Sequence, residues 1–240
     1  MSPLYTPGKV VLAKDYTEGD RYFSNVSLLL HGNGANGSTT IVDSSPTPKT
    51  VTAFGNAQIS TAQSKFGGAS IAFDGTGDTL SVQANSAFEF GTGDFTWEAW
   101  VYLNTLATVN GLYYYGNANN NRLQILVQTN GSFSVYAEIG ASFVDAASSA
   151  SAVSVTTWTH LAATRSGNTF RCFVNGVLSG TSTGALILPS GQTPVIGNAV
   201  TSNTNRNLNG YIDDLRITKG VARYTANFAP PTAAFADAQF

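Results

Sequence analysis

The sequence predicts an all-β fold, an antiparallel two-sheet β-sandwich, and three observations support this class. From Val26 onward, short stretches rich in β-branched and aromatic residues recur about every 8 to 15 residues between clusters of Gly, Asn, Ser and Thr, a spacing typical of all-β domains. Along residues 95–103 the side chains divide between two faces, as in a strand. Turn-forming pairs separate neighbouring stretches, and helical periodicity is nearly absent.

Composition divides the chain into three regions. Residues 1–24 combine two early prolines with a charged patch, and we expect an N-terminal arm or tether there. Residues 25–231 hold the strand-like segments without a convincing boundary, so they predict a single sandwich domain. The pair Pro230-Pro231 ends regular structure, and residues 232–240 form a C-terminal tail of small residues.

The clearest strand covers residues 95–103. The side chains on one of its faces are Phe95, Trp97, Ala99, Val101 and Leu103. Trp100 and Tyr102 lie on the other face, so we expect a central strand whose outer face is partly covered or concave. Residues 122–128 and 132–139 repeat the alternation and predict two further strands.

Three turns join predicted strands into hairpins. Asn130-Gly131 follows residues 122–128 and favours a tight two-residue turn, because Asn-Gly readily takes the positive φ angles that such a turn demands. Gly167-Asn168 and Asn175-Gly176 predict two more hairpins, so we expect the three to form one antiparallel meander. Residues 146–152 are rich in Ala and Ser without an apolar stripe, and we expect a loop.

Charge and composition exclude several classes of function. The 12 basic and 14 acidic residues give a net charge of −2, and no basic cluster exists to neutralise the phosphates of a nucleic acid. No apolar run approaches the roughly 20 residues of a membrane-spanning helix. The single cysteine, Cys172, cannot form an internal disulfide, and the first residues do not resemble a secretory signal. We therefore expect folding in a reducing cytoplasm.

A series of motifs resembles a known family. The motifs are Gly67–Gly75, Asp78–Val82, Gly93–Val101, Trp158–Arg165, Phe173–Gly176, Ile196-Gly197 and Gly210–Ile217. Their order and spacing resemble a laminin-G-like domain of the concanavalin A-like lectin/glucanase group, over roughly residues 26–230. The resemblance implies a concanavalin A-like jelly roll, and binding or scaffolding more often than catalysis. The ending, residues 217–225 with Phe228 and Pro230, is similar to versions of this domain in bacteriophage structural proteins.

No catalytic residues are predicted. Glycoside hydrolysis needs two carboxylates that face each other across a cleft, and enzymatic relatives of this group carry Glu-x-Asp-x-x-Glu on one strand. Here Glu98 shares its face with Trp100 and Tyr102, which are not acids. His31 and His160 do not provide a triad or a zinc site, and we expect His160 to be structural. The protein is therefore predicted not to be an enzyme.

Calcium is the one cofactor that the sequence suggests. Asp213 is expected to share the core-facing side of its strand with Leu215 and Ile217, where a carboxylate needs a cation or N–H donors. Its candidate companions as calcium ligands are Asp43, Asp74 and Asp78. The alternative is that each acid caps a turn by accepting backbone N–H groups.

A glycan-binding site is the remaining candidate, because aromatic rings stack on sugar rings while amides and arginines bind hydroxyls. Trp100, Tyr102 and Tyr136 are expected on the outward faces of adjacent strands, as one platform. A loop at residues 111–122 adds Tyr113, Tyr114, Tyr115, Asn117, Asn119, Asn121 and Arg122. The alternative is that most of these rings pack into the sandwich.

These features and the resemblance together lead us to expect a non-enzymatic virion surface protein that decorates a capsid or tail or binds host-surface glycans. It would fold in the host cytoplasm. The expected partners are other virion proteins, through residues 1–24, host polysaccharide and further copies of the same chain. Nucleic acid and membrane insertion are not expected. The alternatives are a structural cement protein without sugar affinity and a polysaccharide-degrading enzyme.

Overall fold

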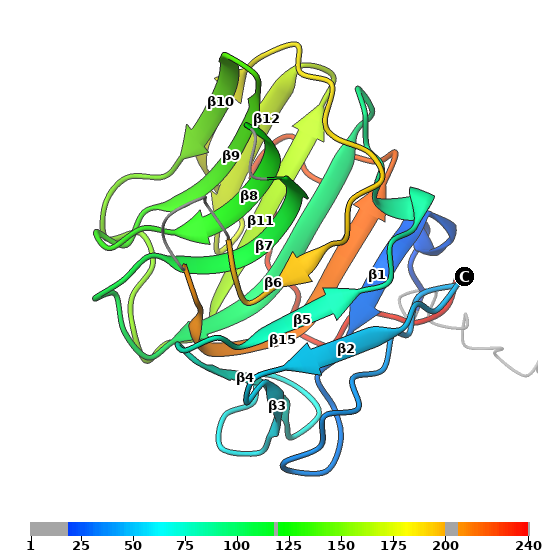
Figure 1. Cartoon of the computed structure of the whole chain (residues 1–240), viewed down its shortest axis with the longest axis vertical. Coiled ribbons are helices and arrows are strands. Elements are labelled where there is room, and N and C mark those ends of the chain that lie inside the picture. The colour runs from blue at the N-terminus through cyan, green and yellow to red at the C-terminus, as the bar shows by residue number, and fades with distance from the viewer. Residues whose placement is uncertain (1–18, 118–119, 200–205, 240) are drawn as a thin grey trace, which may run out of the picture.

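A computed structural model describes residues 19–117, 120–199 and 206–239. Two antiparallel β-sheets stack face to face (Figure 1), which confirms the predicted all-β sandwich. Residues 1–18, most of the expected N-terminal arm, lie outside the described residues. No helix in the described part of the chain is long and apolar enough to cross a membrane.

The described elements follow the chain in this order: η1 (Phe23–Asn25), β1 (Val26–Leu30), β2 (Val51–Phe54), β3 (Gln58–Ser60), β4 (Ser70–Asp74), β5 (Thr79–Val82), η2 (Ser86–Phe88), β6 (Phe95–Leu103), β7 (Asn110–Asn117), β8 (Asn121–Val127), β9 (Phe133–Ile139), β10 (Ser142–Ala147), β11 (Thr159–Ser166), β12 (Thr169–Val174), β13 (Val177–Thr183), β14 (Val195–Ile196) and β15 (Asn209–Lys219). The two η elements are single turns of 3-10 helix.

The first sheet has eight strands in the order β13-β12-β11-β6-β15-β4-β3, with β1 also paired to β15. β15 has β6 on one side and two shorter strands on the other. Residues 209–212 pair with β4, and residues 215–218 pair with β1. A β-bulge at Asp213 and Asp214 separates the two pairings, and Asp214 has a left-handed φ of 52°. The bulge allows one strand to serve two partners along the same edge.

The second sheet has seven strands in the order β10-β9-β8-β7-β14-β5-β2. β7 to β10 form an antiparallel meander. The turn after β8 differs from the predicted two-residue turn, because Gly131 takes a positive φ of 76° and Asn130 does not. Gln128 N donates instead to Ser132 O at 2.8 Å, which closes a three-residue loop.

The single predicted meander is wrong, because its hairpins belong to different sheets. Asn130-Gly131 joins β8 and β9 in the seven-stranded sheet, whereas Gly167-Asn168 and Asn175-Gly176 join β11, β12 and β13 in the eight-stranded sheet. The predicted loop at residues 146–152 also begins too early. Ala146 and Ala147 end strand β10, where they pair with β9.

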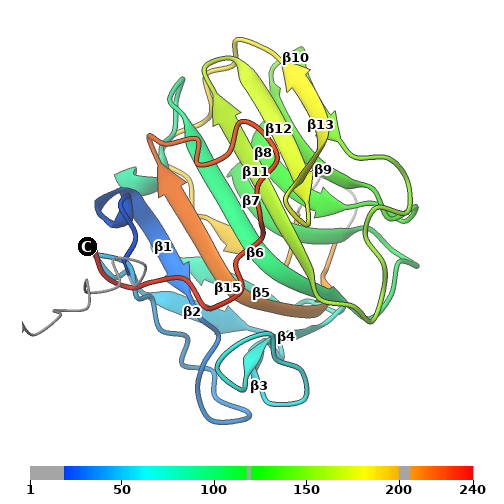
Figure 2. The ribbon, with the colours of Figure 1, turned by 180° about the vertical axis from the view of Figure 1, so that it is seen from behind.

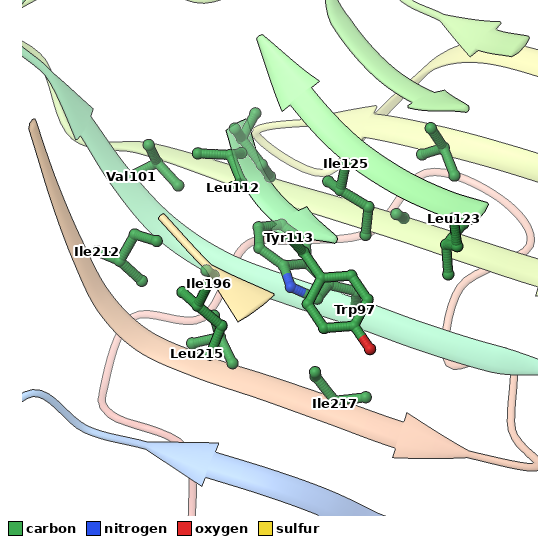
Figure 3. Packing of buried hydrophobic residues seen from close by; sticks show 14 of the residues in the cluster. Trp97, Val101, Leu112, Tyr113, Leu123, Ile125, Ile196, Ile212, Leu215 and Ile217 are labelled. Atoms are coloured by element: carbon green, nitrogen blue, oxygen red, sulfur yellow. The ribbon is translucent and has the colours of Figure 1, made fainter. Parts of the chain in front are cut away.

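One cluster of apolar side chains fills the space between the sheets (Figure 3). Trp97 of β6 and Tyr113 of β7 extend into this space from opposite sheets, and each is 1% exposed. Leu112 and Ile125 of the seven-stranded sheet face Ile212 of β15 across the same layer. Each fully buried aliphatic side chain contributes roughly 1.5–3 kcal/mol to folding, so this layer holds the two sheets together.

Residues 220–239 run across the outer face of the eight-stranded sheet (Figure 2). The hydroxyls of Thr96 and Thr164 donate to backbone carbonyls of this segment at 2.9 and 3.0 Å. Phe235, within the predicted C-terminal tail, packs against Val26 of β1 and is 7% exposed. The outer face of this sheet is therefore a second buried layer.

Candidate functional site

The outer face of the seven-stranded sheet carries a row of polar and aromatic side chains. Tyr136 of β9, Gln124 of β8 and Tyr114 of β7 stand opposite one another across the three strands. Their neighbours along the strands, such as Leu123 and Ala137, belong to the core, so the alternation turns the row outward. Since neighbouring strands lie about 4.8 Å apart, the row spans roughly 10 Å.

At the Tyr136 end of this row, an ion pair and a second ring form a compact group with Tyr136. Arg122 Nη2 lies 2.6 Å from Glu138 Oε2, and Arg122 Cζ lies 5.8 Å from the centre of the Tyr136 ring. Phe143 of β10 stacks on Tyr136 with ring centres 6.1 Å apart. Phe143 is 64% exposed, so the two rings form an apolar ledge toward solvent.

Ala199 and Arg206 approach the same face from the β7 side. Gly111 of β7 makes this approach feasible, because a Cβ there would lie 2.2 Å from Ala199 N and 2.5 Å from Arg206 O. Gly111 N donates to Arg206 O at 2.9 Å. Arg206 Nη1 donates to Gln124 Oε1 at 3.3 Å, so a second arginine reaches the row.

Burial and neighbouring charges tune the groups of this face. Burial, and then the Glu138 carboxylate, raise the pKa of Tyr136. The Tyr136 hydroxyl therefore stays a neutral donor at physiological pH. Burial and the nearby charge of Arg122 lower the pKa of Arg206; a guanidinium nevertheless stays protonated in proteins.

The row has a buried floor and accessible groups above it. Tyr114 and Gln124 are only 6% and 1% exposed, so they support the site from below. The groups that remain partly or largely exposed are Arg122, Tyr136, Glu138, Phe143 and Arg206. Stacked rings flanked by convergent polar groups suit a ligand that has one apolar face and a rim of hydroxyls.

The predicted loop at residues 111–122 is wrong for most of its length, because β7 runs to Asn117 and β8 begins at Asn121. Tyr113 and Tyr115 point into the core and are 1% and 0% exposed, which is the packing role left open as the alternative. Asn117 and Asn121 face each other where β7 and β8 end their pairing. Asn119 lies outside the described residues.

The predicted platform of Trp100, Tyr102 and Tyr136 is wrong. Trp100 and Tyr102 belong to β6 in the eight-stranded sheet, whereas Tyr136 belongs to β9 in the seven-stranded sheet. Outward faces of different sheets point in opposite directions. Trp100 is 6% exposed with Lys65 Nζ 3.8 Å from its ring centre, and Tyr102 packs on the Trp158 ring at 5.6 Å.

Sequence reasoning missed four residues of the site. Two of them carried a readable signal, since the alternation along residues 122–128 and 132–139 already places Gln124 and Glu138 on the outward side. Phe143 and Arg206 carried none. The position of Phe143 depends on which strand lies at the sheet edge, and that of Arg206 depends on its approach to Gly111; both are set by long-range contacts.

Glu98, the acid singled out for a hydrolytic mechanism, lies in a buried ion network. Arg216 Nε and Nη2 donate to Glu98 Oε1 at 3.0 and 2.8 Å, and the Tyr224 hydroxyl donates to Oε2 at 2.8 Å. Although burial raises the pKa of Glu98, the Arg216 charge and the His160 and Arg223 side chains lower it to about 2. Such a carboxyl is ionised at neutral pH and does not donate a proton to a leaving group.

Both histidines occupy structural positions. His160 has no exposed surface and lies against the rings of Trp100 and Phe228, at 5.3 and 5.7 Å between centres. His31 Nδ1 lies 2.6 Å from Asp214 Oδ1, and this contact raises the pKa of His31.

The aspartates predicted as calcium ligands do not form one cluster. Among the described residues, no three His, Cys, Asp or Glu side chains lie close enough together to hold a metal. Asp43 accepts backbone N–H groups of Leu29, Ser45 and Lys49, and Asp78 accepts from Asp74 N at 2.7 Å. These contacts are the turn-capping role, and calcium binding stays a prediction.

Asp213 faces the outer side of its sheet, contrary to the predicted inward position. Ile212 and Leu215 are both core residues, because the bulge inserts an extra residue between them and reverses the alternation. Asp213 Oδ2 accepts from Lys65 N and Phe66 N at 2.7 and 3.0 Å. Burial raises the pKa of Asp213 to about 6.

Comparison with known families agrees with this architecture. Residues 74–223 match the model described as the Concanavalin A-like lectin/glucanases superfamily. The match covers more than half of the chain, so the chain belongs to this family, as its motifs predicted. Among curated proteins, no sequence matches.

Solved structures share the fold at low sequence identity. Domain 4 of AbnA, a GH43 extracellular arabinanase from Geobacillus stearothermophilus, in complex with arabinotriose, matches with a TM-score of 0.60 and 17% identity over 82% of this chain and 93% of that domain. The binding domain of Botulinum neurotoxin DC in complex with SialylT matches with a TM-score of 0.61 and 17% identity over 84% of this chain. The present chain spans about half (50%) of that toxin domain. At these identities, the likeness concerns the fold alone.

Proposed function

We propose that this protein is a non-enzymatic glycan-binding module whose ligand lies across the outer face of the seven-stranded sheet. The observation that carries the proposal is the exposed ledge of Tyr136 and Phe143, flanked by Arg122 and Arg206. A pyranose has an apolar face for the ledge and equatorial hydroxyls for the guanidinium and carboxylate groups. The occurrence of arabinotriose on a domain of the same fold supports this choice of ligand class.

The proposed setting is the outside of a virus particle, on its capsid or tail, where the module binds host-surface glycans. This part rests on the similarity of residues 217–230 to domains of bacteriophage structural proteins. Residues 1–24 would attach the module to other virion proteins, and several copies would act together. Antibody labelling of purified particles in the electron microscope tests the setting. Particles that assemble with a chain lacking residues 1–18, which keeps the ion pair of Asp20 with Arg216, should carry no label.

The glycan proposal is tested by a glycan array with the full chain, followed by titration calorimetry with the best ligand. Tyr136→Ala should lower the affinity about 5- to 10-fold, because loss of one stacking ring removes roughly 1–1.5 kcal/mol. Tyr102→Ala is the matched control, since Tyr102 is a partly exposed ring on the outer side of the other sheet. It should leave the affinity unchanged.

Circular dichroism before titration establishes that both variants keep the β-sandwich. Absence of retention on every glycan would overturn the proposal and favour the structural cement alternative. Equal losses in the two variants would also contradict it, because the ligand would then not depend on the seven-stranded sheet.

A further inference from the structure

The proposed glycan site contains two guanidinium groups, and a carboxylate pairs with one of them. Arg122 has a partner, Glu138, at 2.6 Å. Arg206 forms no ion pair among the described residues, and its Nη1 donates to the neutral amide oxygen of Gln124 at 3.3 Å. Residues 195–209, which carry Arg206 and surround it in sequence, contain no Asp or Glu.

The position of Arg206 is fixed by its backbone. Its carbonyl oxygen accepts from Gly111 N at 2.9 Å and from Ala199 N at 3.3 Å. This anchors the residue over β7, and from there its side chain reaches Gln124 on β8. Burial, and then the nearby Arg122 charge, lower the pKa of Arg206. Two like charges are thus held near one another without a shared counterion.

The other acid on this face does not balance the charge. Asp145 of β10 stands opposite Tyr136, on the side away from β8, and its carboxylate accepts a hydrogen bond from the Ser134 hydroxyl. A carboxylate brought by the ligand would therefore meet an arginine that has hydrogen-bond donors to spare.

Building on the proposed function, we infer that this face selects acidic glycans, with a uronic or sialic acid residue stacked on Tyr136 and its carboxylate held by Arg206 beside Arg122. Arginine suits this role because its planar fork presents paired N–H donors to a carboxylate. The neutral hydroxyls of the same sugar would contact Glu138 and the Arg122 edge.

The experiment compares acidic oligosaccharides with their carboxyl-reduced forms by titration calorimetry on the full chain. The probes are tri-galacturonate, hyaluronan hexasaccharide and a sialic acid trimer, each with its reduced counterpart. At least one acidic probe should bind about 10-fold or more tightly than its neutral form, a ratio typical of a charge-assisted hydrogen bond. Its affinity should fall as salt rises, while that of the neutral form stays constant.

Three variants assign the preference to one side chain. Arg206→Gln should reduce the acidic-to-neutral ratio to about 2 or less, and Arg206→Lys should restore part of it because the charge returns. Arg171→Gln is the matched control: Arg171 is a partly buried arginine on β12 in the opposite sheet, and its removal should leave the ratio unchanged.

The failures of the two proposals are distinguishable. Equal binding of acidic and reduced probes, or an unchanged ratio in Arg206→Gln, would overturn the acidic preference while the glycan-binding function stands. Binding of neutral glycans alone would do the same. Absence of binding to every acidic and neutral probe would overturn both.

Discussion

The two outer faces of the sandwich use the same three residue types in different ways. On the eight-stranded sheet, Glu98 binds Arg216 and Tyr224, and the side chains of the Glu98–Arg216 pair are 0% and 8% exposed. On the seven-stranded sheet, Glu138 binds Arg122 beside Tyr136, and the paired side chains are 16% and 13% exposed. Residues 220–239 run across the face that carries Glu98 and Arg216 and supply the Tyr224 of the first trio, whereas the second trio stays partly exposed.

This difference indicates that burial, more than residue type, determines whether such a trio stabilises the fold or stays accessible to a ligand. Buried charges lose their hydration, so each must have a partner or the fold is strongly destabilised. Partly exposed charges such as Arg122 and Glu138 keep some of their hydration, so their pairing contributes less to folding and they remain within reach of a ligand. The covered face therefore stabilises the domain, and the open face is suited to recognition.

The largest expected effect comes from removing the glutamate of each trio. Glu98→Ala should lower the free energy of unfolding by about 3–5 kcal/mol, because Arg216 would keep its buried charge without this partner. Glu138→Ala should cost less than about 1 kcal/mol, because its partner is partly solvated. Urea unfolding of both variants measures this difference. Equal losses in the free energy of unfolding would show that burial does not determine the contribution of the glutamate.

A smaller effect concerns Asp213, whose folded pKa of about 6 lies above the ordinary value of 3.8. Between these two values the folded protein holds a proton that the unfolded chain has lost, so stability falls as pH rises from about 4 to 6. Asp213→Asn should abolish this fall. At pH 7 it should raise the free energy of unfolding by roughly 1–3 kcal/mol, so the variant should unfold at a higher urea concentration.

The measurement is the urea midpoint of both proteins between pH 4 and 7. The Glu98 carboxyl does not contribute in this upper range, because its lowered pKa acts only as pH falls through about 4.5 toward 2. A wild-type midpoint that rises between pH 4 and 6 would contradict the assignment to Asp213.

The smallest effect on stability comes from two exposed phenylalanines at opposite edges of the seven-stranded sheet. Phe143 on β10 and Phe54 on β2 are 64% and 52% exposed, so replacing either by Ser should change stability by less than about 0.5 kcal/mol. The affinity for glycan sharpens the comparison. Phe143→Ser should weaken binding about 3-fold, because it removes half of the ledge, and Phe54→Ser should leave binding unchanged.

Features that depend on residues close together in the sequence, such as strands and tight turns, were predicted correctly. The alternation along residues 95–103 coincides with strand β6, and the pair Asn175-Gly176 forms the expected hairpin between β12 and β13. These features follow from the two-residue repeat of a strand and from positive φ at turn residues. Local chemistry decides them.

The predictions that were wrong concern features that depend on contacts between distant parts of the chain. The sheet to which β6 and β9 belong follows from pairing with β15 and β8, and no local pattern shows this. The bulge at Asp213 reverses the alternation, because β15 changes partner there. Three of the seven site residues, Tyr114, Arg122 and Tyr136, were predicted from the sequence, whereas the place of Arg206 depends on its approach to Gly111.

The pairing of β1 with β15 has a consequence for how the protein is made. Asp20, just before β1, forms an ion pair with Arg216 on β15, 196 positions along the chain. A nascent chain on the ribosome therefore carries Leu28, Leu29 and Leu30 without their partner strand until almost all of the domain has emerged. Contacts this remote slow folding, and an unpaired apolar strand invites association. Until synthesis reaches β15, we expect residues 28–30 to stay without their partner strand and open to association with other chains.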